Sequence, residues 1–83
     1  MPKIPRNISG RKLVKLLKRF DYKPVRQTGS HIRLLSNYRE NEHKITIPDH
    51  SSLNISTLTN ILNDVSDYLN IEKENLVRIL FEQ

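Results

Sequence analysis

The chain has 83 residues, a formal net charge of +5 and no cysteine. The lack of cysteine excludes disulfide bonds, thiolate zinc sites and a cysteine nucleophile, and it fits a reducing cytoplasm. No apolar run approaches the roughly 18 residues of a membrane span, and the first ten residues lack the apolar core of a secretory signal. We therefore expect a cytoplasmic protein without membrane contact, folded as a single domain over residues 1–83.

The charge is divided unevenly along the chain. Residues 1–48 hold 12 Lys or Arg and 3 Asp or Glu, a net charge of +9, whereas residues 49–83 hold 2 and 6, a net charge of −4. Such asymmetry favours a polyanion as the partner of the N-terminal half. From charge alone, a basic surface that is merely solvated is the alternative.

The N-terminal part predicts a short lead-in followed by a helix. Residues 1–8 contain two prolines and no periodicity, which indicates an extended segment. A helix is expected over residues 10–20 with Ser9 as its N-cap. Lys12 and Lys15 lie on its basic surface. The apolar residues have the spacing i, i+3, i+4 and i+7 of one buried stripe, and they are Leu13, Leu16, Leu17 and Phe20.

Three short strands are predicted next, over residues 22–28, 31–36 and 43–48. Gly29 and Ser30 form a two-residue turn signal between the first two strands, and Pro48 closes the third. Because side chains alternate along a strand, one face of the sheet should be apolar and the other basic. The residues expected on the buried side are Val25, Ile32, Leu34, Ile45 and Ile47. The expected outer face carries Arg26, Thr28, His31, Arg33, Leu35, Lys44 and Thr46.

The helical period returns after the strands. A second helix is expected from Ser56, as N-cap, to about Leu69, with an interruption at Asn70 and Ile71. A short terminal helix is expected over residues 72–81, with more apolar residues than it can bury, so that some should face a partner chain. The predicted order is α-β-β-β-α plus a terminal helix, which is an α+β fold with two layers.

His31 is the strongest candidate for chemistry, and the alternative is an ordinary surface imidazole at the start of a strand. Cutting RNA without a metal requires removal of a proton from a 2′-hydroxyl, and imidazole titrates near neutral pH. Positive groups must stabilise the charge that develops on the phosphoryl oxygens, and Arg26, Arg33 and Lys44 share the predicted face of His31. His50 is either a loop residue or a second group in contact with substrate.

The other polar candidates have simpler interpretations. His43 shares the parity of the buried isoleucines and is expected to be a partly covered structural residue. The three histidines are separated by 12 and 7 residues, which matches no zinc pattern, so we expect no metal site and no cofactor. Ser30 and His31 cannot form a nucleophile and base pair, because adjacent residues of a strand point to opposite faces.

Four segments together resemble the HicA toxins of the HicAB toxin–antitoxin systems, also called the YcfA-like family. They are Ser9–Leu13, Val25–His31 with its "VRQTGSH" core, Ile47–His50 and Ser56–Leu62, where Ser56 replaces the glycine of the family pattern. The resemblance implies a fold like that of double-stranded-RNA-binding domains and cleavage of mRNA. It also implies that His31 is the key histidine and that a HicB-like antitoxin covers its face. We expect a monomer when free and a hetero-oligomer with the antitoxin.

Three functions are compatible with these features. The first is a metal-independent mRNA endoribonuclease with His31 as catalytic residue, in which RNA contacts come from Lys12, Lys15, Arg26, Ser30, Arg33, Lys44 and His50. The second is a non-catalytic RNA-binding module of the double-stranded-RNA-binding kind. The third is a protein-interaction domain that uses the apolar residues of the terminal helix.

Overall fold

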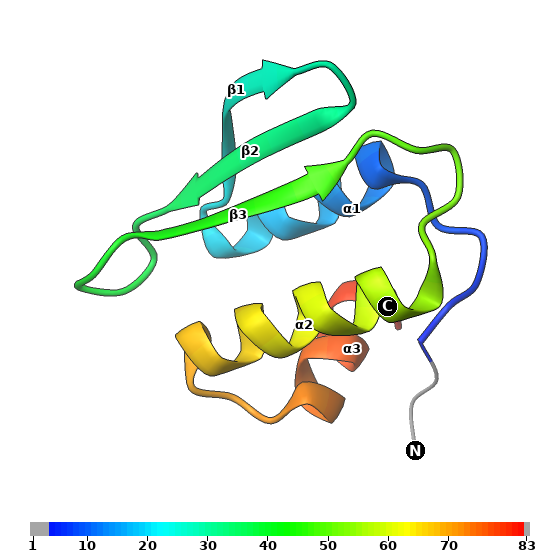
Figure 1. Ribbon diagram of the computed structural model, residues 1–83. Helices are drawn as coiled ribbons and strands as arrows, with labels where there is room; N and C mark the ends of the chain where they lie inside the picture. The colour runs from blue at the N-terminus through cyan, green and yellow to red at the C-terminus, as the bar shows by residue number, and fades with distance from the viewer. Residues whose placement is uncertain (1–3, 83) are drawn as a thin grey trace.

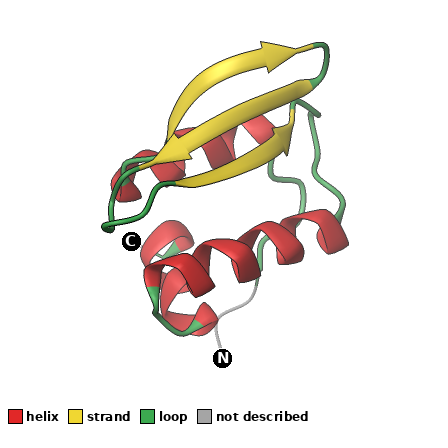
Figure 2. Cartoon of the chain, turned by 60° about the vertical axis from the view of Figure 1, so that its left-hand side comes forward, coloured by secondary structure: helices red, strands yellow, loops and turns green. Residues whose placement is uncertain are grey.

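The computed structural model describes residues 4–82, and the predictions for residues 1–3 and 83 lie outside this range. Three strands form one layer, and the helices lie together on one side of it (Figure 1, Figure 2). The elements are α1 (Gly10–Leu17), the 3-10 helix η1 (Lys18–Phe20), β1 (Lys23–Thr28), β2 (His31–Ser36), β3 (His43–Pro48), α2 (Ile55–Leu69) and α3 (Lys73–Phe81). The predicted α-β-β-β-α order with a terminal helix is confirmed. None of the helices within residues 4–82 has the length and apolar character that a membrane crossing requires.

The helix boundaries follow from local capping. Ser9 caps α1 as predicted, because its side chain accepts a hydrogen bond of 3.0 Å from the backbone N–H of Lys12. The predicted cap of α2 is wrong. Asn54, and not Ser56, is the N-cap, and its side chain accepts a 2.8 Å hydrogen bond from the backbone N–H of Ser56. Asn70 ends α2 in the left-handed conformation, with φ of 57°.

The sheet is antiparallel with the order β1-β2-β3, so β2 is central and β1 and β3 are edges. Gly29 has a φ of 56°, which is the conformation that the predicted two-residue turn needs at this position. Four residues expected on the inner face of the sheet are indeed buried, namely Ile32, Leu34, Ile45 and Ile47. Register is therefore as the period-two pattern predicts in β2 and β3.

The prediction for Val25 is wrong, since 56% of this side chain is exposed. The pairing of β1 with β2 shifts register between Pro24 and Arg26, so that Val25 is the extra residue of a bulge. All six residues of β1 are exposed. A bulge moves a side chain off the face that simple alternation assigns to it, and the alternation alone carries no sign of this.

The terminal helix completes the core rather than offering an apolar surface. Leu76, Val77 and Leu80 are buried, and Ile79 and Phe81 are partly buried against the same cluster. The expectation that apolar residues of this helix face a partner chain is therefore wrong. The physical reason is that α3 folds back on α2, from which it is separated by a single turn at Asn70 and Ile71. This finding removes the basis of the third function named above.

Candidate active site

His31 and two arginines meet in one hollow on the outer face of the sheet. Thr28 is the cross-strand partner of His31, and Arg26 is the partner of Arg33. On the other side of β2, Thr46 of β3 is opposite Arg33. These five side chains line a hollow of about 410 Å³, which we call the His31 hollow. The outer face that period-two alternation predicted is thus present, with His31 and both arginines brought together.

The charge of the His31 hollow is not neutralised. Arg26 and Arg33 stand directly opposite each other on neighbouring strands, an arrangement that destabilises a sheet when both side chains carry the same charge. Within residues 4–82, no carboxylate lies within 4.0 Å of either guanidinium group. Because no carboxylate offsets the repulsion between the two arginines, this face is suited to an anionic ligand. Guanidinium groups match the geometry of phosphate especially well.

The side chain of His31 is exposed and makes no hydrogen bond to another side chain among the described residues. Its backbone, in contrast, is held from two directions. The hairpin turn at Gly29 precedes it, and the backbone N–H of Asp49 donates a hydrogen bond of 2.6 Å to the C=O of Ser30. A free imidazole on a fixed backbone is available to accept or donate a proton to a bound molecule.

A network of three side chains fastens the turn beside His31 to α1. The guanidinium of Arg11 donates two hydrogen bonds to the carboxylate of Asp49, at 3.0 and 3.1 Å, and Gln27 donates a third at 3.2 Å. The hydrogen bonds from Arg11 hold the pKa of Asp49 below its ordinary value, and its positive charge acts in the same direction. The sequence analysis missed this network. Its only signal in the sequence was that Gln27 and Asp49 lie within the Val25–His31 and Ile47–His50 segments.

The N-terminus of α1 reaches the same region through its backbone. The N–H of Gly10 donates a 2.9 Å hydrogen bond to the C=O of His50. A Cβ atom at Gly10 would lie 1.9 Å from the carbonyl oxygen of Pro48, the cross-strand partner of His31. Glycine at this position therefore lets α1 approach the end of β3 closely enough to support the hairpin that carries His31.

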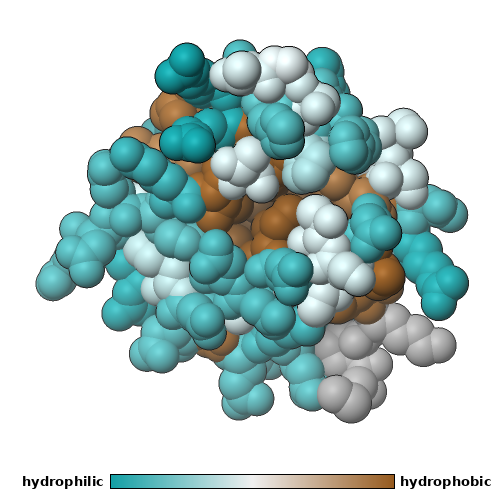
Figure 3. Space-filling view, viewed as in Figure 1, coloured by the Kyte–Doolittle hydropathy of each residue, from teal (hydrophilic) through white to brown (hydrophobic). Residues whose placement is uncertain are grey.

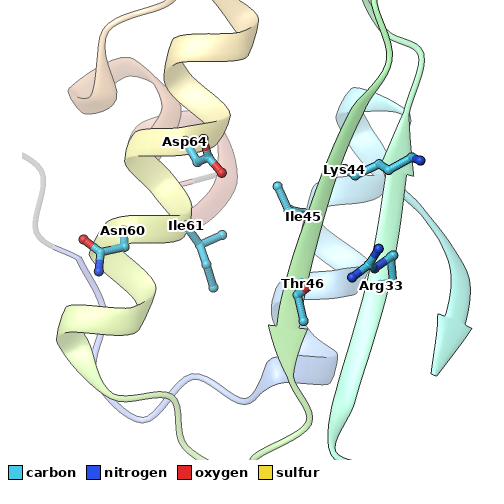
Figure 4. Close-up of a pocket in the computed structure, with 7 residues that line it drawn as sticks. All are labelled: Arg33, Lys44, Ile45, Thr46, Asn60, Ile61 and Asp64. Atoms are coloured by element: carbon cyan, nitrogen blue, oxygen red, sulfur yellow. The ribbon is translucent and has the colours of Figure 1, made fainter. Parts of the chain in front are cut away.

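Lys44 lies on the same outer face but outside the His31 hollow. It is opposite Leu35 of β2, and with Arg33 it borders a second hollow of about 370 Å³ that runs along β3 toward α2. Figure 4 shows the two basic side chains on the sheet side of this hollow, with α2 across from them. Arg33 thus belongs to both hollows, and basic side chains continue from one to the other.

The remaining predicted contact residues are more distant from the hollow. Lys12 and Lys15 are exposed on α1, and Lys12 borders a different depression with residues 5–9 and Phe81. Ser30 is exposed in the hairpin turn, and His50 is exposed two residues after Pro48. None of these four side chains lines the His31 hollow. The structure thus brings together Arg26, His31 and Arg33 but not the whole predicted set.

The prediction that His43 is a partly covered structural residue is confirmed, with 18% of its side chain exposed. Its Nδ1 is 2.6 Å from the hydroxyl of Tyr22, and its ring is stacked on Tyr68 with centroids 4.6 Å apart. Burial raises the pKa of Tyr22 well above its ordinary value, so this hydroxyl stays protonated. Among residues 4–82, no three His, Cys, Asp or Glu side chains gather as a metal-binding group.

The fold and the hollow define a class, namely a small α+β protein whose three-stranded sheet presents an exposed histidine beside two arginines. A family model for the HicA toxin of bacterial toxin–antitoxin systems matches residues 10–66, which is more than half of the chain. The chain therefore belongs to the HicA toxin family. The matched range includes α1, the whole sheet and the His31 hollow, and it ends within α2. Comparisons with curated proteins and with solved structures found no significant match.

Proposed function

We propose that this chain is a metal-independent endoribonuclease that cleaves mRNA with His31 as its catalytic residue. The observation that carries this proposal is the composition of the His31 hollow: one exposed imidazole, two opposed arginines and no lining carboxylate. A phosphodiester brings the negative charge that such a hollow lacks. Membership of the HicA toxin family supports a toxin that acts on RNA.

The reaction follows from the groups in the hollow. His31 accepts the proton of a ribose 2′-hydroxyl, the O2′ atom forms a bond to the adjacent phosphorus, and the bond from phosphorus to O5′ breaks. Arg26 and Arg33 stabilise the negative charge that grows on the phosphoryl oxygens. The departing O5′ takes up a proton from water or from protonated His31 or His50, which leaves a 2′,3′-cyclic phosphate and a 5′-hydroxyl. Positioned proton transfer of this kind contributes about 10²–10⁴-fold in rate.

The predicted contact residues outside the His31 hollow would bind the RNA strand on either side of the cleaved bond. Lys44 extends the positive charge of the hollow along β3, while Ser30 and His50 lie at the hairpin end of the sheet. Lys12 and Lys15 add charge on α1. Contacts of this kind go to the phosphates and carry little sequence preference, and each one makes binding more sensitive to salt.

We further propose that a HicB-like antitoxin binds the His31 face and so blocks access to the hollow. The support is the family membership together with the uncovered basic charge of this face. An acidic partner surface would pair with Arg26 and Arg33 and exclude RNA by occupying the same place. The free toxin would be a monomer and the inhibited form a hetero-oligomer.

The test is cleavage of a 5′-labelled RNA by the purified protein in the presence of a chelator. Wild type should cut and His31→Ala should cut at least about 10²-fold more slowly, while retaining its circular dichroism spectrum. Arg78→Ala, an exposed change on α3, is the matched surface control. RNA with a 2′-deoxy nucleotide at the cleaved position should resist, because it lacks the attacking hydroxyl. Equal rates for His31→Ala and wild type, or equal cutting of the deoxy substrate, would refute the mechanism.

One observation favours the non-catalytic RNA-binding module as the second candidate. Among the residues that line the hollow, His31 is the one imidazole and there is no carboxyl group, so the hollow itself holds no second group to act as acid for the departing oxygen. Binding of RNA that weakens in Arg26→Ala, without cleavage by any variant, would support this module instead.

A further inference from the structure

The free edge of β3 has backbone groups without partners. Pairing with β2 continues past the strand, because the N–H of Asp49 donates to the C=O of Ser30 directly opposite. In an antiparallel ladder, the residues whose backbone bonds the neighbouring strand alternate along the chain. The odd-numbered residues of β3 therefore face β2, and the N–H and C=O groups of Lys44 and Thr46 point outward. Within residues 4–82, no helix, loop or side chain supplies a hydrogen bond to them.

The other edge of the sheet is protected in ways that β3 is not. β1 contains Pro24, which has no N–H, and a bulge follows it at Val25. Prolines and bulges are devices that prevent a further strand from joining an edge. β3 pairs without interruption from His43 to Pro48, and its proline is at the last position. Of the two edges, β3 is thus the one that can accept another strand.

A groove with an apolar bottom runs beside this edge. It is the hollow of about 370 Å³ between β3 and α2. Ile45 points from the strand toward Ile61 of the helix, while Asn60 and Asp64 border the helix side (Figure 4). Figure 3 shows apolar atoms at the bottom of a hollow in the middle of this face, surrounded by hydrophilic residues. An added strand would therefore meet apolar side chains on its inner side.

The two sides of an added strand would meet different surroundings. Its side chains alternate between the layers, as they do in β3. On the inner side they would lie near Ile45 and Ile61, and on the outer side they would lie beside Lys44, with Arg33 one strand further. Apolar side chains suit the first environment, and carboxylates suit the second.

We propose that the β3 edge is a docking site for an extended segment of a partner protein, which joins the sheet as a fourth strand and alternates acidic with apolar side chains. Four backbone groups, the N–H and C=O of Lys44 and Thr46, would bond the segment, and the groove would take its apolar side chains. This site uses the outward backbone groups of β3, although the side chain of Thr46 also lines the His31 hollow and Lys44 is a proposed RNA contact. It goes beyond the proposed RNA cleavage, and peptide binding tests it without any measurement of RNA cleavage.

Charge argues against a second copy of the chain as the occupant, and chemistry argues against RNA. A second copy of the chain, paired edge to edge, would bring Lys44 near its own copy, and each chain carries a net charge of +5. RNA has no peptide groups to continue the ladder and no apolar side chains for Ile45 and Ile61. A protein strand with carboxylates satisfies both the backbone and the charge.

The experiment is a titration of the ¹⁵N-labelled full chain with a capped eight-residue peptide that alternates glutamate and valine, followed by NMR. We expect the largest shifts, and slowed hydrogen exchange, at the amides of Lys44 and Thr46. A peptide that alternates lysine and valine is the control for charge. Binding of the lysine peptide as tightly as the glutamate peptide would refute the charge argument. An absence of shifts along β3 at millimolar peptide would refute the docking site.

Two variants and a matched control separate the contributions. Lys44→Glu should weaken the glutamate peptide about fivefold and strengthen the lysine peptide, whereas Lys23→Glu on the protected β1 edge should leave both affinities within about twofold. Thr46→Pro removes an outward N–H without breaking the ladder to β2, and should weaken binding about tenfold. If that variant fails to fold, the Lys44→Glu result decides. Self-association of the free chain through β3 would overturn the proposed occupant.

Discussion

Replacement of Gly10 by alanine tests how α1 is joined to the end of the sheet. A Cβ atom at this position would lie 1.9 Å from the carbonyl oxygen of Pro48 and 3.0 Å from its carbonyl carbon. The obstacle is backbone, which cannot rotate away as a side chain can. The helix and strand must therefore separate by about 1 Å, and such overpacking costs about 1–3 kcal/mol.

Two further terms enter the magnitude. Separation weakens the 2.9 Å hydrogen bond from the N–H of Gly10 to the C=O of His50, a loss of about 1 kcal/mol. Alanine, on the other hand, favours a helix over glycine by at most about 1 kcal/mol. The free energy of unfolding should thus fall by about 1–3 kcal/mol. For a chain of this size, the midpoint of thermal unfolding should then fall by about 5–20 °C.

The assay is thermal and urea unfolding of wild type and Gly10→Ala, followed by circular dichroism. Gly29→Ala is the comparison, because no atom lies within 4 Å of its Cβ and its cost comes from a φ of +56°, about 1 kcal/mol. Gly10→Ala should be the less stable of the two. A Gly10→Ala protein as stable as wild type, or more stable, would refute the close approach of α1 to Pro48.

Three further perturbations test other parts of the fold. Ser36→Ala should lower the free energy of unfolding in urea by about 1–3 kcal/mol, because the buried hydroxyl donates to the C=O of Phe20 at 2.6 Å. Hydrogen bonds from Arg11 lower the pKa of Asp49 in the folded protein. The stability that this pair contributes is present above the pKa of Asp49 in the unfolded chain and is lost as the pH falls through its pKa in the folded protein. Asp49→Asn should therefore lose less stability than wild type as the pH falls below about 4, as measured by urea unfolding. Burial raises the pKa of Tyr22, so the protonated hydroxyl contributes stability below about pH 10, and this stability is lost at higher pH. In an absorbance titration of tyrosinate, Tyr22→Phe should remove the part that titrates at the highest pH.

Much of the local structure followed from the sequence. Ser9 and the apolar stripe after it predicted α1, and Gly29 predicted the hairpin turn. The alternation in β2 and β3 placed His31 and Arg33 on the outer face and the isoleucines on the inner one. Each of these features depends on residues within a few positions of one another, where periodicity and turn chemistry act directly.

The errors arose where neighbours in space decide the outcome. Val25 has the parity of a buried residue, but it is the extra residue of a bulge between Pro24 and Arg26. The apolar residues of α3 exceeded what one isolated helix can cover, yet Leu76 and Leu80 are buried because the helix folds back on α2. The periodicity of apolar residues describes one helix or strand at a time. It carries no information about the neighbouring elements against which that helix or strand packs.

The candidate site shows the same division. The sequence by itself determined that a histidine and two arginines share one face of a basic sheet, because alternation in a strand is a local property. Only the tertiary structure decided that Asp49 joins Arg11 and Gln27, and that α2 lies beside the unpartnered edge of β3. These contacts join residues far apart in the chain, and the packing of the helices on one face of the sheet brings them together.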